Sequence, residues 1–180
     1  MGNNILGILK TVSSKYPYLY EFPKEFLLNA LRVPKGLAVI IIGNIMASDN
    51  KALIHLYLES DILPVLKSLL ENDTGYQKEV LWILSNIACE YEGARKMIGC
   101  SDLLETIVSK RHFSKKDALW TFTNLAKTTN GDGALAMVAA DVLTILTNNI
   151  SYTNVLLSRL ALQGIIHIME KIGDRIFTIM

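Results

Sequence analysis

The sequence is poor in the residues that build disulfide frameworks, metal sites and nucleic-acid surfaces. Its 180 residues include two cysteines and three histidines, and neither type shows the spacing of a zinc site. Two thiols are too few for a disulfide scaffold, which favours a reducing compartment. The formal net charge is +1 and 19% of the residues are charged. These values indicate neither a disordered chain nor a strongly basic nucleic-acid binder.

Long apolar runs and catalytic motifs are also missing. The longest apolar stretch, residues 37–47, is interrupted by Gly43 and Asn44 and is too short to span a bilayer. Residues 1–9 lack the basic region and the cleavage site of a secretory signal. A nucleophile elbow and a phosphate-binding glycine loop are absent. We therefore expect no enzyme, no cofactor, no metal and no membrane partner.

What the sequence does contain is a stripe of side chains that occurs twice. Each copy has an acid, a Trp three residues later and an Asn four residues after that, a spacing that places all three on one face of a helix. A reduced copy has Ile40 in place of the Trp and ends at Asn44, so the three Asn residues are 42 and 38 positions apart. The full copies are Glu79, Trp82 and Asn86, and Asp117, Trp120 and Asn124. We name Asn44, Trp82, Asn86, Trp120 and Asn124 the Trp–Asn ladder.

A second sequence motif recurs with about the same period as the ladder. Asp61, Asp102 and Asp141 each follow a small residue and precede two aliphatic residues, at spacings of 41 and 39 positions. Asp before an apolar run predicts a helix N-cap, because its carboxylate can accept the first N–H groups of the helix. His167 occupies the position of a fourth ladder Asn. The two marks together predict a repeat of about 40 residues.

Apolar residues recur at helical spacing, and alternating strand patterns of useful length are absent. Three helices in about 40 residues predict an all-α, right-handed armadillo-repeat solenoid of about four repeats, the first and last degenerate. The expected helices span 50–60, 62–71 and 76–90, then 93–99, 102–110 and 114–127, then 133–139, 142–149 and 154–171. We expect one domain over residues 1–180, with an opening unit at 1–48, repeats at 50–90, 93–128 and 133–172, and a tail at 173–180.

The residues around the ladder resemble the importin α family, the adaptors that carry nuclear localisation signals. Residues 78–87, K-E-V-L-W-I-L-S-N-I, are similar to the family's K-E-A-x-W-x-x-S-N-I, and residues 116–124, K-D-A-L-W-T-F-T-N, to the K-E-A-A-W-A-x-[ST]-N of its next repeat. Residues 43–45 match the G-N-I of a repeat without Trp, and residues 161–168 are similar to a final repeat with A-L-N-G and N-I. The resemblance covers roughly residues 36–172 and corresponds to the C-terminal repeats, which hold the minor signal-binding site.

This resemblance implies a nuclear import adaptor of the cytoplasm and nucleus, whole or truncated, whose cargo proteins carry basic nuclear localisation signals. A lysine-rich signal would lie extended along the concave face, with its main chain held by the ladder asparagines and its lysine stems between the indoles. The implied accessory residues are the acids Glu79 and Asp117 and the hydroxyls Ser85 and Thr123. No counterpart of the basic N-terminal segment that binds importin β is present, so importin β is a doubtful partner.

An armadillo scaffold for a different protein partner is the alternative. In that case the indoles belong to the core, and the asparagines bond loops or the next helix. Residues 110–116, K-R-H-F-S-K-K, could be a nuclear signal or a nucleic-acid patch, but the sequence favours a solvated loop between helices. We expect no nucleic-acid partner.

Overall fold

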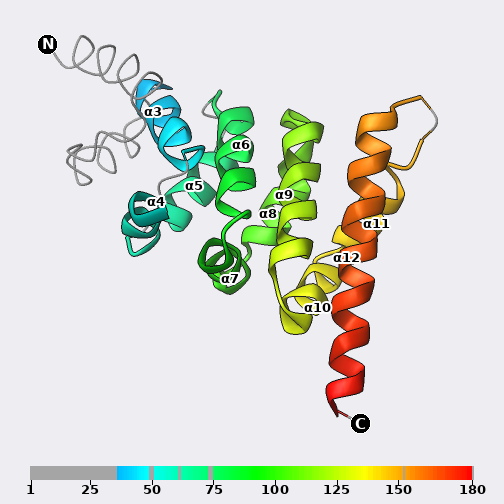
Figure 1. The fold of residues 1–180 in the computed structure, drawn as a ribbon. Coiled ribbons are helices and arrows are strands. Elements are labelled where there is room, and N and C mark those ends of the chain that lie inside the picture. The colour runs from blue at the N-terminus through cyan, green and yellow to red at the C-terminus, as the bar shows by residue number, and fades with distance from the viewer. Residues whose placement is uncertain (1–35, 49–50, 61, 73–74, 152, 180) are drawn as a thin grey trace, which may run out of the picture.

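The computed structural model describes residues 36–48, 51–60, 62–72, 75–151 and 153–179, and these ranges form helices and turns without a strand. Most of the predicted opening unit therefore lies outside the described residues. The elements, numbered as in Figure 1, are α3 (Gly36–Met46), α4 (Lys51–Leu58), α5 (Ile62–Glu71), α6 (Gln77–Ile87), α7 (Tyr91–Gly99), α8 (Leu103–Lys110), the 3-10 turn η1 (Arg111–Phe113), α9 (Lys115–Thr128), α10 (Gly131–Ala139), α11 (Val142–Thr147) and α12 (Val155–Ile179).

The helices form two layers that repeat along the chain. The helices α3, α6, α9 and α12 stand side by side, and each packs against the next (Figure 1). We call these four the ladder helices. In the other layer α4 packs on α7 and α7 on α10, while α5 packs on α8. Three successive three-helix units thus stack into a solenoid, which confirms the predicted all-α repeat architecture.

A continuous apolar core fills the space between the layers. It includes fully buried side chains from each ladder helix, among them Ile42, Leu84, Phe122 and Ala161. The apolar positions that the sequence shows at helical spacing are therefore the inward faces of the helices. Because each unit buries its apolar face against its neighbours, the stack of repeats, rather than a single repeat, is the folding unit.

The prediction that Asp102 and Asp141 cap helices is wrong. Their φ angles are 56° and 65°, and neither carboxylate bonds the first turn of the helix that follows. Asp tolerates the left-handed region because its short side chain can hydrogen-bond locally. The repeated motif therefore marks a tight left-handed turn between the first and second helices of a unit. Asp61, the remaining member of the motif, lies outside the described residues.

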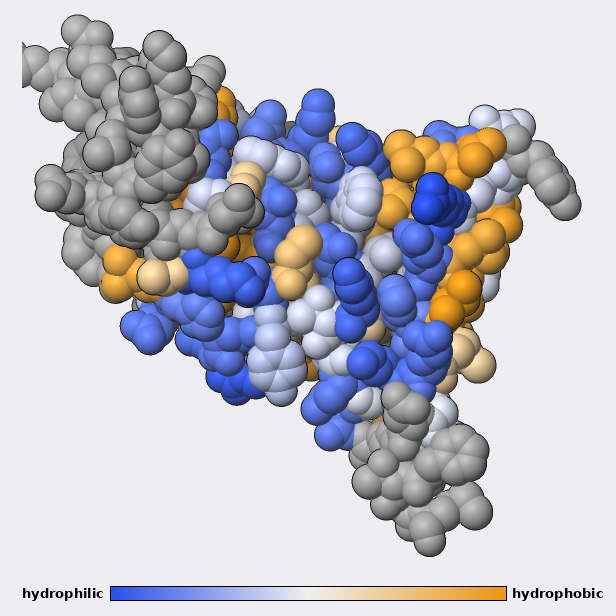
Figure 2. All heavy atoms as spheres, viewed as in Figure 1, coloured by the Kyte–Doolittle hydropathy of each residue, from blue (hydrophilic) through white to orange (hydrophobic). Residues whose placement is uncertain are grey.

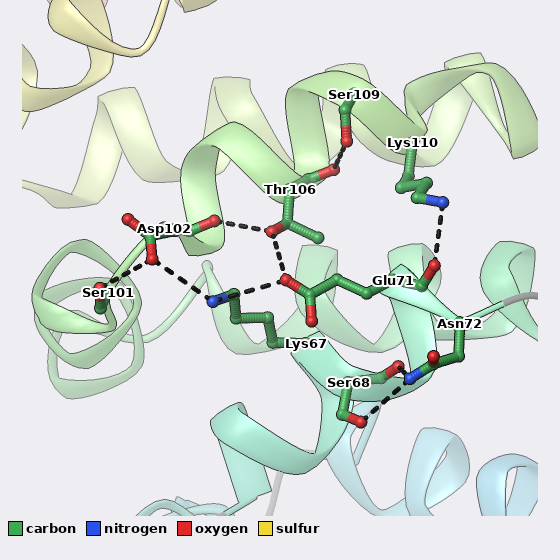
Figure 3. A network of polar contacts seen from close by, with 9 residues as sticks. All are labelled: Lys67, Ser68, Glu71, Asn72, Ser101, Asp102, Thr106, Ser109 and Lys110. Atoms are coloured by element: carbon green, nitrogen blue, oxygen red, sulfur yellow. Dashed lines mark hydrogen bonds and ion pairs between the residues drawn. The ribbon is translucent and has the colours of Figure 1, made fainter.

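Asp102 instead joins a polar network between α5 and α8 (Figure 3). Lys67 Nζ lies 3.6 Å from the Asp102 carboxylate and 3.5 Å from that of Glu71. Thr106 Oγ1 donates to Glu71 Oε1 at 3.3 Å, and Lys110 Nζ donates to the Glu71 carbonyl oxygen at 3.0 Å. These side chains tie the second helices of two consecutive repeats together, which helps to fix the stacking of the ladder helices.

Several helix ends differ from the predicted ones: α6 ends at Ile87 instead of 90 and α11 at Thr147 instead of 149, and three of the differences involve a glycine. α7 and α10 begin two residues before Gly93 and Gly133, and both glycines lie where the chain leaves a ladder helix. A Cβ atom would lie 2.2 Å from the Ile87 carbonyl oxygen at Gly93, and 1.8 Å from Thr129 Oγ1 at Gly133. α12 continues past the predicted end at 171, since an isolated glycine such as Gly173 costs a helix only about 1 kcal/mol.

Candidate functional site

The ladder lies on consecutive, adjacent helices. Asn44 is on α3, Trp82 and Asn86 are on α6, and Trp120 and Asn124 are on α9. Because α3 packs on α6 and α6 on α9, side chains at equivalent positions of these helices form a row across the stack.

Trp82 is partly buried and lies against the preceding ladder helix. A Cβ atom built on Gly43 would be 2.2 Å from Trp82 Cζ3 and 2.9 Å from Cε3. The indole edge therefore occupies the space that a side chain at Gly43 would need. This role of Gly43 is not among the predictions from the sequence, although a single small residue inside the bulky run I-I-I-G-N-I-M was a signal for it.

Trp120 is the more accessible indole, with 36% of its surface exposed. Neither indole is fully buried, since Trp82 is also partly accessible. Large aromatic side chains of a solenoid are expected to be buried in its core. Trp82 does pack against the core as a partly buried residue, whereas Trp120 is exposed on α9.

The three ladder carboxamides are partly buried, and two of them have different surroundings. Asn124 Nδ2 donates to the Ser85 carbonyl oxygen at 2.9 Å, which links α9 to α6. Its Oδ1 atom and its second N–H form no hydrogen bond with a described residue, so the carboxamide keeps one acceptor and one donor for another partner. Asn86 Nδ2 is buried and has no hydrogen-bond partner among the described residues. An unpaired buried amide destabilises the folded state, so it favours any rearrangement that supplies an acceptor.

The two hydroxyl residues beside the ladder are buried and already bonded. Ser85 Oγ donates to the Trp82 carbonyl oxygen at 2.7 Å, and Thr123 Oγ1 donates to the Leu160 carbonyl oxygen of α12 at 3.0 Å. Ser85 and Thr123 are only 6% and 5% exposed. Each hydroxyl uses its one proton on a backbone carbonyl, so it can meet a ligand only as an acceptor, through the lone pairs of its oxygen.

The two acids lie in the first turns of α6 and α9, where the helix dipole favours a negative charge. Ser114 Oγ donates to Asp117 Oδ2 at 2.5 Å and accepts from the Asp117 N–H at 3.4 Å, a reciprocal cap of α9. Glu79 is partly buried and forms no ion pair with a described residue. Of the two carboxylates, that of Glu79 therefore has fewer interactions within the described part of the protein.

The last ladder helix lacks an indole. Gln163 of α12 is exposed at the position equivalent to Trp120, and His167 occupies that of Asn124. His167 Nδ1 lies 3.4 Å from the Glu170 carboxylate. The aromatic part of the row therefore ends at α9.

The described residues provide no metal-binding group of three or more His, Cys, Asp or Glu side chains. Burial raises the pKa of the Cys89 and Cys100 thiols, and the Glu90 carboxylate raises that of Cys89 further. Neither thiol is an activated thiolate at neutral pH. Within the part of the chain that the structure describes, no helix has the length and apolar character needed to cross a bilayer.

Comparisons with known proteins identify the fold. No protein-family model matches the chain, and no curated protein sequence matches it. Among solved structures, a designed armadillo repeat protein in complex with the peptide (KR)4 has a TM-score of 0.76 and 22% identity, over 91% of this chain and 73% of that one. Two engineered proteins from the Northeast Structural Genomics Consortium have TM-scores of 0.72 and 0.71 at 19% and 20% identity. The matches cover 88% and 84% of this chain and 72% and 40% of those chains. These similarities show that the chain folds as an armadillo-repeat solenoid.

Proposed function

We propose that this chain binds lysine-rich peptide segments in extended form along the Trp–Asn ladder, as a nuclear import adaptor of the cytoplasm and nucleus without catalytic activity. The observation that carries the proposal is the pair of accessible indoles, Trp82 and Trp120, on adjacent helices that also carry ladder carboxamides. The structural similarity to a designed armadillo protein in complex with (KR)4 supports it. So does the resemblance of residues 78–87 and 116–124 to importin α.

The spacing of the row suits an extended peptide. Packed helices lie about 8–10 Å apart, and an extended chain advances about 3.3 Å per residue, so one repeat matches about three peptide residues. The free Oδ1 atom of Asn124 accepts a peptide N–H at one such interval. The partly buried carboxamides of Asn44 and Asn86 serve the neighbouring intervals.

The indoles recognise the lysine side chain. Its aliphatic stem packs between Trp82 and Trp120, and its ammonium group lies near an indole face, an interaction worth about 0.5–2 kcal/mol. Glu79, which has no ion-pair partner among the described residues, adds a compensating negative charge. Because the individual contributions are small, we expect micromolar affinity, about −8 kcal/mol.

The test is a titration of a fluorescent lysine-rich peptide, with a Lys→Ala peptide as its control. We predict that Trp120→Ala and Trp82→Ala each weaken binding by about 1–2 kcal/mol, while circular dichroism shows a folded protein. Tyr91→Ala is the matched control variant, because Tyr91 is an aromatic residue on α7, 63% exposed and outside the ladder. If the folded wild-type protein binds the Lys→Ala peptide equally well, the proposal fails.

The hydrogen bond from Asn124 to Ser85 favours a second candidate, a scaffold for a different protein partner in which the ladder is structural. Asn124→Ala separates the two. A loss of unfolding free energy with unchanged peptide affinity supports the scaffold. A loss of affinity that exceeds the effect on stability supports the peptide-binding ladder.

A further inference from the structure

The two helices that carry the indoles hold more cations than anions. α6 and α9 contain four lysines and two acids, a formal charge of +2. All four lysines are exposed, and none forms an ion pair with a described residue. Figure 2 shows a largely hydrophilic surface where α6 and α9 lie in Figure 1. These lysines are Lys78, Lys115, Lys116 and Lys127. A peptide with positive charges alone therefore meets an excess of its own sign.

Lys127 lies on the ladder face of α9, on the far side of Asn124 from the indole. It follows Asn124 by three residues and Trp120 by seven, so the three residues share one face of the helix. With a rise of about 1.5 Å per residue, Trp120 lies about 6 Å from Asn124 toward the start of α9, and Lys127 about 4.5 Å toward its end. A ligand that passes over Asn124 therefore has the indole on one side and the Lys127 ammonium group on the other.

Cys89 occupies the position equivalent to Lys127 at the end of α6, three residues after Asn86, and its thiol is exposed. Burial raises the pKa of this thiol, the Glu90 carboxylate raises it further, and the charge of Lys127 lowers it, so Lys127 acts on the end of α6 as well as on α9. Lys51 Nζ lies 3.5 Å from Glu90 Oε2 and balances that carboxylate. At this edge of the ladder, α6 therefore presents a neutral thiol, and α9 presents a cation without an ion-pair partner among the described residues.

The geometry of an extended peptide brings its side chains to both edges of the ladder. Successive side chains point to opposite sides of the main chain. If one lysine lies between the indoles while the main chain passes over the ladder asparagines, the two residues next to that lysine point to the opposite edge. The peptide advances about 3.3 Å per residue and packed helices lie about 8–10 Å apart, so one neighbour lies over α9 and the other over α6. The first meets Lys127, and the second meets Cys89.

We propose that Lys127 is a specificity-determining residue, which selects peptides with an acidic residue directly next to the lysine that lies between Trp82 and Trp120. This inference rests on the proposed peptide-binding function and narrows its ligand to lysine-rich segments in which a lysine and an acid are neighbours. The acid pairs with the free ammonium group of Lys127 and offsets the excess positive charge of α6 and α9. An acid at the other neighbouring position meets the neutral Cys89 thiol and gains no ion pair.

The experiment is a titration of the full chain with four fluorescent peptides that differ only around one central lysine, whose neutral flanks fix the register. Their central triplets are Ala-Lys-Ala, Glu-Lys-Ala, Ala-Lys-Glu and Ala-Ala-Ala. We expect one of the two Glu peptides to bind about two- to fivefold more tightly than Ala-Lys-Ala, and which one it is reports the direction of the peptide. No gain from either Glu peptide, or equal gains from both, overturns the proposal. If Ala-Lys-Ala binds no better than Ala-Ala-Ala, the peptide-binding function itself fails, and this inference fails with it.

Variants of the protein assign the gain to Lys127, with folding checked by circular dichroism. Lys127→Ala should remove the advantage of the favoured Glu peptide, and Lys127→Glu should turn it into a disadvantage of similar size. A role of Lys127 in the stability of α9 alone would leave the ratio of the two affinities unchanged. The matched control is Lys115→Ala, which removes the same charge from the start of the same helix, at an exposed position. If Lys115→Ala removes the advantage as completely as Lys127→Ala, the overall charge of α9 rather than Lys127 governs selection, and the proposal is overturned.

Discussion

Tyr57 has the largest of the fully buried side chains in the described core, and its hydroxyl has no hydrogen-bond partner there. A buried hydroxyl without a partner keeps the cost of its desolvation. The aromatic ring contributes to packing in the same way with or without the oxygen. The ring of Tyr57 therefore stabilises the fold, whereas its unpaired hydroxyl lowers that stabilisation.

We predict that Tyr57→Phe stabilises the protein by up to about 1 kcal/mol at neutral pH, measured by urea unfolding. Burial raises the pKa of Tyr57 above its usual value of 10.0, so above pH 10 the unfolded state ionises while the folded state resists. Wild-type stability should accordingly fall as the pH rises above about 10, and the Phe variant should lose less. A variant less stable by more than about 1 kcal/mol would show that the hydroxyl has a bonding partner.

Gly43 sets the position of Trp82, because a Cβ atom there would lie 2.2 Å from the indole. We predict that Gly43→Ala displaces the indole and costs about 1–3 kcal/mol of strain, partly offset by about 1 kcal/mol of helix propensity. Tryptophan fluorescence and urea unfolding measure the two effects. Gly99→Ala is the control, since a Cβ atom at Gly99 meets nothing within 4 Å. An unchanged emission spectrum in Gly43→Ala would contradict the contact.

At the scale of the element, the N-terminus of α9 has a side-chain cap, which that of α6 lacks. Ser114 accepts from the Asp117 N–H at 3.4 Å while its hydroxyl donates to the Asp117 carboxylate at 2.5 Å. We predict that Ser114→Ala lowers the unfolding free energy by about 1 kcal/mol. The control is Ser101→Ala, because the Ser101 hydroxyl also donates to an Asp carboxylate, Asp102 Oδ2, but caps no helix. Equal losses in the two variants would show that the cap itself contributes nothing.

The sequence predicted the elements well because their signals repeat. Two independent marks shared a period of about 40 residues, and the predicted helix 62–71 coincides with α5. The N-cap role of Asp102 was wrong because the residues that favour caps also favour left-handed turns. For the candidate site, the sequence predicted which positions share a row across the helices, but not the contacts of their side chains. The bond between Asn124 and Ser85 depends on how α9 is aligned with α6, and the bond between Thr123 and Leu160 on how it is aligned with α12, at separations of 39 and 37 positions. Helical spacing within one helix does not contain that alignment.

At the scale of the whole molecule, the formal net charge of +1 gives no general attraction for a basic peptide. Electrostatic steering of the peptide must therefore come from local charges. Glu79 attracts a basic peptide, whereas the cations at the start of α9 repel it. Lys115 and Lys116 are exposed there, and Lys116 shares a helix face with Trp120 at i+4. A basic peptide that approaches the exposed indole therefore meets two like charges.

We predict that the double change Lys115→Gln and Lys116→Gln raises the association rate of a lysine-rich peptide roughly two- to fivefold at low salt, measured by stopped-flow fluorescence. The gain should disappear near 1 M salt, where the screening length falls to about 3 Å. Lys51→Gln with Arg95→Gln removes the same two charges from α4 and α7, outside the ladder helices, at side chains that are 72% and 61% exposed. If this control speeds association as much, net charge rather than the position of the lysines governs the encounter. If neither pair changes the rate, the peptide does not approach over α9.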